Sequence, residues 1–120
     1  MTKNKNPKQY DLEERTLNFA GSVIKYCKKL PKTVVDGELA KQLARAATSV
    51  GANYIEANEA LGKKDFLMRI EICRKEAKES GYWLRLMEVS NPDFRQEQET
   101  LLEESTELTK IFSSILTKSQ

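Results

Sequence analysis

Histidine is absent from this 120-residue sequence, and cysteine, proline and glycine are scarce, with 2, 3 and 5 copies. Without histidine the chain lacks the commonest general base, the usual nitrogen ligand of zinc and any triad built on an imidazole. Two cysteines are too few for a zinc cluster or a disulfide framework. We therefore expect a protein that is not an enzyme and that holds no cofactor and no metal ion.

Long apolar runs are also missing. No stretch of 18 apolar residues is present, and the first ten residues contain no apolar core, so the sequence predicts neither a transmembrane span nor a secretory signal. We expect a cytoplasmic protein without a membrane partner, whose thiols are reduced. Cys27 and Cys73 lie on or beside apolar stripes, which predicts buried small hydrophobic side chains rather than nucleophiles.

What the sequence does contain is typical of a helical domain, with 32% charged and 39% hydrophobic residues. Residues 1–10 are basic, polar and interrupted by proline, which predicts a flexible tail. Residues 11–118 predict one domain of four helices. The expected boundaries are Asp11 and Pro31 for the first helix, Asp36 and Gly62 for the second, a cap at Asp65 for the third, and Asn91-Pro92 for the start of the fourth.

In each of these segments apolar residues recur at steps of three and four, the period of a helix packed on one side. The expected seams are Leu12, Thr16, Phe19, Val23, Tyr26 and Leu30; Leu39, Leu43, Ala46, Val50, Tyr54, Ala57 and Leu61; Phe66, Ile70, Cys73, Ala77, Ser80, Leu84 and Met87; and Phe94, Leu101, Leu108, Phe112 and Ile115. Helices of similar length joined by short connections favour an all-α fold, an antiparallel up-down-up-down four-helix bundle.

The third helix carries a second apolar strip beside its seam. At roughly 100° per residue this strip lies about a quarter turn or more from the seam, and its members are Met68, Ile72, Tyr82, Trp83 and Leu86. Tryptophan and methionine are enriched in interface cores, which favours a contact between subunits. The alternative is that the strip packs against the fourth helix.

The second helix carries two further patterns. Small residues at Ala40, Ala44, Ala47 and Gly51 allow another helix to approach closely, and ordinary packing inside the bundle is the simpler interpretation. A polar stripe of Arg45, Ser49, Asn53 and Glu56 occupies another side. Either this stripe is solvated, or it forms a partly buried hydrogen-bonded network with Glu79 of the third helix.

The runs ARAATSVGANYIEA (44–57) and KKDFLMRIEICRKEAKESGYWLRL (63–86), with the opening DLEERTLNFAGSVIKYCKKLP, resemble the four-helix bundle family of proteins encoded in 23S rRNA intervening sequences. The family pattern is matched by Arg45, Ala46, Ala47, Ser49, Asn53, Glu56 and Glu79. The resemblance implies a homopentamer and kinship with the accessory protein of diversity-generating retroelements, a pentameric bundle that binds nucleic acid and a reverse transcriptase. Many members have a glycine soon after the acidic residue of the second helix, whereas this helix is expected to continue to Gly62.

The charge distribution suggests a function. Residues 1–36 and 63–90 are net positive, whereas residues 37–62 and 91–120 are net negative. We expect an oligomeric binding protein whose basic faces contact RNA or DNA phosphates, through Lys63, Lys64, Arg74, Lys75, Lys78 and Arg85, with Lys3, Lys5 and Lys8 of the tail. One alternative is a solvated face, with these cations paired to Glu71 and Glu79; another is a scaffold whose apolar strips dock a protein partner.

Overall fold

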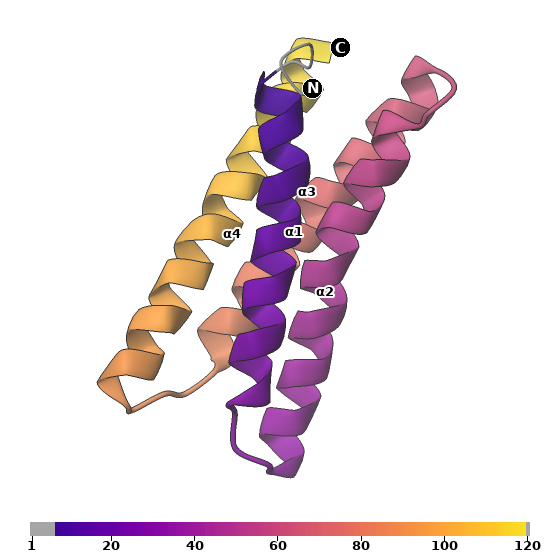
Figure 1. Ribbon diagram of the computed structural model, residues 1–120. Coiled ribbons are helices and arrows are strands. Elements are labelled where there is room, and N and C mark those ends of the chain that lie inside the picture. Colours follow the sequence, from indigo (N-terminus) through magenta and orange to yellow (C-terminus); the bar gives the residue numbers. More distant parts are fainter. Residues whose placement is uncertain (1–6, 120) are drawn as a thin grey trace.

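A computed structural model describes residues 7–119 of the chain. These residues form four helices in the order α1 (Pro7–Lys28), α2 (Val34–Asn58), α3 (Lys63–Leu86) and α4 (Pro92–Ser119). Consecutive helices run antiparallel and pack side by side (Figure 1). The α2–α3 and α3–α4 pairs share the largest contacts, the α1–α2 contact is smaller, and the α1–α4 contact is much smaller. The predicted all-α, antiparallel four-helix bundle is therefore confirmed.

The helices are not parallel rods. The turn between α2 and α3 lies well away from the start of α1 and the end of α4, and at the other end the α3–α4 connection lies away from the α1–α2 turn (Figure 1). The bundle is accordingly elongated, with extents of 44 × 28 × 20 Å. Many residues of α3 outside its buried seam are exposed to solvent.

Local sequence signals set most helix ends. Pro31 follows the end of α1, as its missing N–H requires. The Asn91 side chain caps α4 by accepting hydrogen bonds from the backbone N–H groups of Asp93 (2.9 Å) and Phe94 (3.1 Å), and Pro92 takes the first helical position. The start of α4 lies where the sequence predicted it, whereas α1 ends at Lys28, three residues before the predicted boundary at Pro31.

Three helices begin earlier than the sequence predicted. The predicted cap of α3 at Asp65 is wrong, because the helix starts at Lys63 with Gly62 as its cap. α1 starts at Pro7 instead of Asp11, because proline at the first helical position loses no hydrogen bond; the rest of the predicted tail, residues 1–6, lies outside the described residues. α2 starts at Val34 instead of Asp36 because Thr33 is its cap. The Thr33 hydroxyl accepts a hydrogen bond from the Asp36 N–H at 3.0 Å.

The predicted end of α2 at Gly62 is wrong. The helix stops at Asn58, and Gly62 instead precedes α3 in an extended conformation, where its carbonyl accepts the first helical hydrogen bond from Phe66 at 3.0 Å. Glycine serves well at either end of a helix, so the residue alone could not decide. As a result Leu61, expected in the seam, is 100% exposed.

The core follows the predicted periodicity closely. All six seam residues of α1 are buried, and so is the α3 seam from Ile70 to Met87. In α4 the neighbouring Leu116 is buried while Ile115 is only partly covered. The buried layer also contains polar side chains: the hydroxyl residues Thr16, Ser80 and Ser105, and Glu76.

Glycines allow the closest helix contacts. A Cβ on Gly51 of α2 would lie 3.1 Å from Oγ1 of Thr16 in α1, and a Cβ on Gly81 of α3 would lie 2.9 Å from Oγ of Ser105 in α4. At Gly51 the small-residue pattern therefore serves packing between α1 and α2. This agrees with the simpler interpretation, ordinary packing inside the bundle. The Gly81 contact holds α3 against α4 in the same way.

The close approach at Gly81 gives a first prediction. We expect Gly81→Ala to lower the free energy of unfolding by about 1 kcal/mol, because overpacking costs about 1–3 kcal/mol and the better helix propensity of alanine returns about 1 kcal/mol. Urea denaturation followed by circular dichroism measures this change.

Gly21→Ala is the matched control, since nothing lies within 4 Å of a Cβ at this position in α1; it should stabilise by about 0.5–1 kcal/mol. Adding Ser105→Ala to Gly81→Ala removes the obstructing oxygen and should restore most of the stability. Equal stability of the Gly81→Ala and Gly21→Ala proteins would show that α3 and α4 do not approach closely.

Candidate functional site

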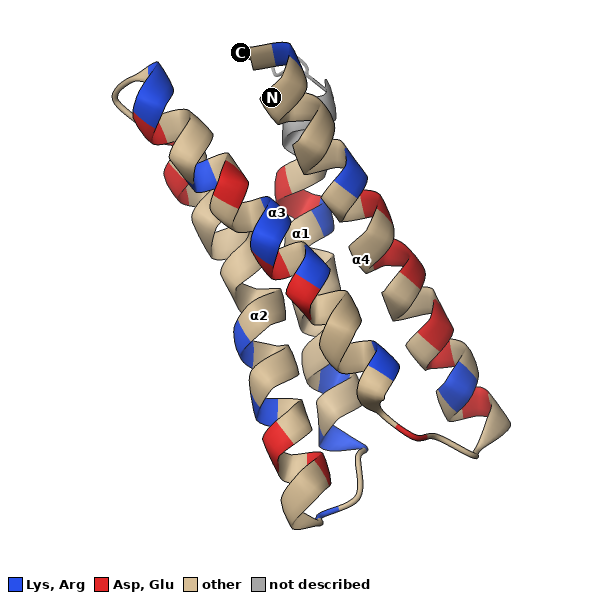
Figure 2. Cartoon of the chain, turned by 180° about the vertical axis from the view of Figure 1, so that it is seen from behind, with Lys and Arg blue, Asp and Glu red and all other residues tan. Residues whose placement is uncertain are grey.

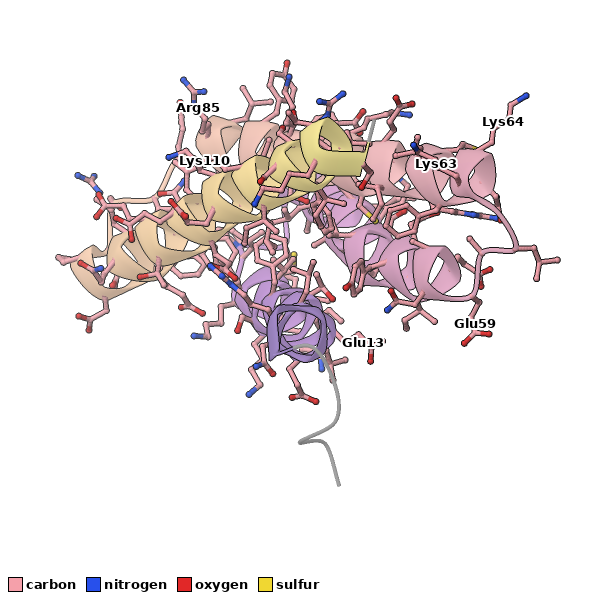
Figure 3. All side chains as sticks on the ribbon, turned by 90° about the horizontal axis from the view of Figure 1, so that it is seen from above. Glu13, Glu59, Lys63, Lys64, Arg85 and Lys110 are labelled. Carbon is pink, nitrogen blue, oxygen red and sulfur yellow. The ribbon has the colours of Figure 1, made fainter. Side chains whose placement is uncertain are left out.

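The basic face of α3 comprises Lys63, Lys64, Arg74, Lys75, Lys78 and Arg85. At roughly 100° per residue these six side chains fall within about a third of the helix circumference. All are exposed except Arg74, which is partly covered. Seen from above, Lys63, Lys64 and Arg85 lie on the α3 side of the molecule, whereas Glu13 and Glu59 lie on the side of α1 and α2 (Figure 3).

Within residues 12–119, none of these six cations takes part in an ion pair or a side-chain hydrogen bond. One of the two carboxylates expected to neutralise them, Glu79, instead accepts a hydrogen bond from Arg45 of α2 at 3.1 Å. The other, Glu71, has no ionic partner in the same part of the chain. The basic face therefore does not form the ion pairs with Glu71 and Glu79 that the alternative of a solvated, internally paired face predicts.

A groove runs between the basic face and α4. Its volume is about 500 Å³, and it is lined by Glu71, Arg74, Lys75, Lys78 and Glu79 of α3 and by Thr109 and Ser113 of α4. We call it the α3–α4 groove. It brings three cations of the basic face together with two hydroxyl residues, which no pattern in the sequence associates with them.

Acidic residues follow most of the length of α4, while α3 carries both signs of charge (Figure 2). Two of these carboxylates hold α1: Glu104 accepts hydrogen bonds from Nε and Nη2 of Arg15 at 2.8 and 3.0 Å, and Glu97 accepts one from Nζ of Lys29 at 2.9 Å. Part of the negative charge of α4 is thus engaged on the flank away from the α3–α4 groove.

A polar cluster joins α2 to α3. Arg45 reaches two carboxylates, Glu79 at 3.1 Å and Glu76 at 3.4 Å. One turn or more further along, the Asn53 amide donates to the carbonyl and the hydroxyl of Ser49, each at 3.0 Å, and its oxygen accepts from Arg69 at 3.0 Å. The cluster is therefore two separate sets of bonds rather than a single network centred on Arg45.

Sequence inspection missed two members of this polar cluster, Arg69 and Glu76. Both lie close to the seam on a helical wheel, and Glu76 stands three residues before Glu79, which was the available signal. Glu56, expected in the cluster, is exposed and bonds to none of it in the described part of the chain. Arg45 is also more exposed than expected, with 51% of its side chain open to solvent, whereas Glu76 keeps only 8%.

The apolar strip of α3, formed by Met68, Ile72, Tyr82, Trp83 and Leu86, remains largely uncovered: Met68, Tyr82 and Leu86 are exposed, and Ile72 and Trp83 are partly buried. Gly81, which marks the side of α3 that touches α4, lies roughly half a turn from the centre of the strip. The strip thus faces away from α4. Packing against the fourth helix, the alternative considered for it, is wrong.

Trp83 anchors the strip to the bundle. Its ring packs against the core and meets Tyr82 edge-on, with ring centroids 5.1 Å apart. The indole N–H is buried and has no hydrogen-bond partner in the described residues. Such a donor costs stability, so Trp83 holds its place through apolar contact alone.

The two cysteines show no sign of activation. Burial raises the pKa of the Cys73 thiol to about 12, and burial also raises the pKa of Cys27. Each Sγ atom lies near a backbone carbonyl oxygen. The distance is 3.4 Å from Cys73 Sγ to the Val50 oxygen and 3.6 Å from Cys27 Sγ to the Ala40 oxygen. A reactive thiol needs a lowered pKa, and both thiols are shifted the other way.

Over residues 7–119, no three His, Cys, Asp or Glu side chains gather in a way that could hold a metal ion. None of the helices in that range combines the length and apolarity that a membrane span requires.

The chain is similar to a known family and to a solved structure. A family model described as 23S rRNA-intervening sequence protein matches residues 8–114. The crystal structure of a protein of unknown function from the S23 ribosomal protein family of Bacteroides thetaiotaomicron is similar to this chain with a TM-score of 0.78 and 32% sequence identity, over 92% of this chain and 98% of that one. No curated protein matches the chain.

The polar cluster gives a second prediction. Arg45→Met should lower the free energy of unfolding by about 1–2 kcal/mol, between the roughly 0–1 kcal/mol of an exposed pair and the roughly 3–5 kcal/mol of a buried one, because only the Glu76 partner is buried. Urea denaturation at neutral pH measures the decrease.

Arg85→Met is the control, an exposed arginine of the same helix pair without an ionic partner in the described chain, and should change stability little. With Glu76→Gln and Glu79→Gln already present, Arg45→Met should cost less than about 0.5 kcal/mol. An undiminished cost in that background would mean that Arg45 acts through packing.

Proposed function

The chain belongs to the 23S rRNA-intervening sequence protein family, and from this premise we propose that it is a non-enzymatic, oligomeric protein that binds the phosphate backbone of RNA or DNA. The similar protein from Bacteroides thetaiotaomicron, whose crystal structure is known, is described as a protein of unknown function. The proposal therefore rests on the chemistry of the basic face.

One observation carries the proposal: six cations share one face of α3, and in the described chain none of them forms an ion pair with a carboxylate. Each phosphate contact releases counterions, so several weak contacts of this kind give salt-sensitive binding. Repetition of the face in an oligomer would multiply the contacts through effective concentration. Of the tail lysines expected to extend the face, Lys3 and Lys5 lie outside the described residues, and Lys8 lies in the first turn of α1.

The basic face is poorly suited to recognising the base sequence of a nucleic acid. Single-stranded nucleic acid is read by aromatic side chains on which bases stack. Tyr82 is the aromatic residue closest to the basic face, and its ring already contacts Trp83. We infer binding that depends on backbone charge and depends little on base sequence.

Oligomerisation is the second part of the proposal. An exposed apolar strip rimmed by polar residues marks an interaction surface, and five copies are what the family resemblance implies. The strip also supports a second candidate function, a scaffold that docks a protein partner there. Salt separates the two functions, because apolar docking persists at high salt and phosphate binding does not.

The basic face gives a third prediction. Lys75→Glu with Lys78→Glu should leave helicity and oligomer size unchanged, because both side chains are exposed and unpaired in the described chain. Affinity for generic RNA or duplex DNA should fall, and the slope of log affinity against log salt should shrink by about 0.7–0.9 for each phosphate that is no longer bound. Fluorescence anisotropy over a salt series measures both quantities.

The matched control is Lys25→Glu with Lys41→Glu, which changes the net charge equally on exposed positions of α1 and α2. It should weaken binding far less. Glu103→Lys on α4 should not weaken binding at all. Absence of any wild-type affinity at low salt would end the nucleic-acid proposal in favour of the scaffold.

Light scattering provides the fourth prediction. At micromolar concentration the wild-type mass should be a multiple of 13.7 kDa, with five subunits expected from the resemblance. Met68→Glu with Leu86→Glu places charges in the apolar strip and should shift the mass toward one subunit, with helicity retained because both residues are exposed. A wild-type mass of one subunit would refute the assembly.

A further inference from the structure

The α3–α4 groove contains more than positive charge. It places Arg74, Lys75 and Lys78 opposite the hydroxyl-bearing residues Thr109 and Ser113 of α4. A cationic face that only contacts solvent has no use for hydroxyl groups facing it. A bound tetrahedral anion has, because it accepts hydrogen bonds from several directions at once.

We propose that the α3–α4 groove is a seat for one phosphodiester group, held by the three cations and oriented by a hydrogen bond from the Ser113 hydroxyl. The inference deepens the proposed nucleic-acid binding and rests on it. It goes further by locating the contact at one groove and by assigning a role to α4, the most acidic helix of the bundle.

The two hydroxyls of the groove are not equivalent. The Thr109 hydroxyl donates to the Ser105 carbonyl at 2.8 Å, so its proton is already engaged. The Ser113 hydroxyl has no hydrogen-bond partner in the described chain, although its side chain is partly buried. Ser113 is therefore the hydroxyl with a proton to donate.

Arg74 supplies the strongest cationic contact. It is the one partly covered member of the basic face, and in the described chain it has no carboxylate or carbonyl partner. A guanidinium is weakly hydrated and forms paired hydrogen bonds with phosphate oxygens. Lys75 and Lys78 add mobile charge at the exposed rim.

Two carboxylates also line the groove and set its strength. Glu79 is held by Arg45 at 3.1 Å, which directs part of its charge toward α2. Glu71 has no such partner in the described chain, so it opposes a phosphate directly. The groove is thus expected to bind weakly at a single site, and removal of the Glu71 charge should tighten it.

The test uses the full chain, a fluorescein-labelled single-stranded RNA and a duplex DNA of the same sequence, with anisotropy titrations between about 50 and 300 mM salt. Ser113→Ala should weaken binding roughly three- to tenfold at every salt concentration, with an unchanged salt slope, because it removes a hydrogen bond and no charge. The weakening should appear with both probes, which share the phosphodiester. Glu71→Gln should strengthen binding about two- to fivefold, most at low salt.

Ser114→Ala is the matched control, an exposed serine one position further along α4 that does not line the groove; it should bind like the wild type. If Ser113→Ala also binds like the wild type while Lys75→Glu with Lys78→Glu weakens binding, the groove is not the seat and only the general basic-face proposal survives. If the wild type binds neither probe, both proposals fail together.

Discussion

The close packing of α3 between α2 and α4 is the constraint on which the rest of the structure depends. Its buried side includes the small residues Cys73, Ala77, Ser80 and Gly81 beside the larger Ile70, Glu76 and Leu84, and the small residues let both neighbours approach closely. The rest of its circumference carries the basic face and the apolar strip, most of whose residues are exposed. The basic face and the apolar strip exist because the bundle needs only one seam of this helix.

This arrangement also separates the charges of the bundle. Carboxylates of α4 bind Arg15 of α1 and Lys29 of the α1–α2 turn, and carboxylates of α3 bind Arg45 of α2. The ion pair with Arg45 thus engages Glu79, one of the two carboxylates expected to neutralise the basic face. What remains on α3 is a set of cations, and of the two carboxylates in the α3–α4 groove only Glu71 is unengaged in the described chain.

The helices and their buried seams were largely predictable from the sequence, because the buried residues recur at the regular spacing of a helix. The α1 residues Leu12 to Leu30 and the Asn91-Pro92 cap came out as expected. Single residues with two equally good uses were not predictable: Gly62 can end one helix or start another, and Thr33 or Asp36 can cap α2. The surroundings of Arg69, Glu76 and Ser113 depend on the relative rotation of neighbouring helices, which no single-helix pattern contains.

The small contact between α1 and α4 has a consequence for how the chain folds. Every extensive helix contact joins neighbours in the sequence, across connections of four or five residues, so contact order is low and folding needs little loop closure. The hairpins can form one after another without waiting for the two ends of the chain to meet. By the same reasoning α1, which packs mainly on α2 and less extensively on α4, is the helix that we expect to open first when the native state fluctuates.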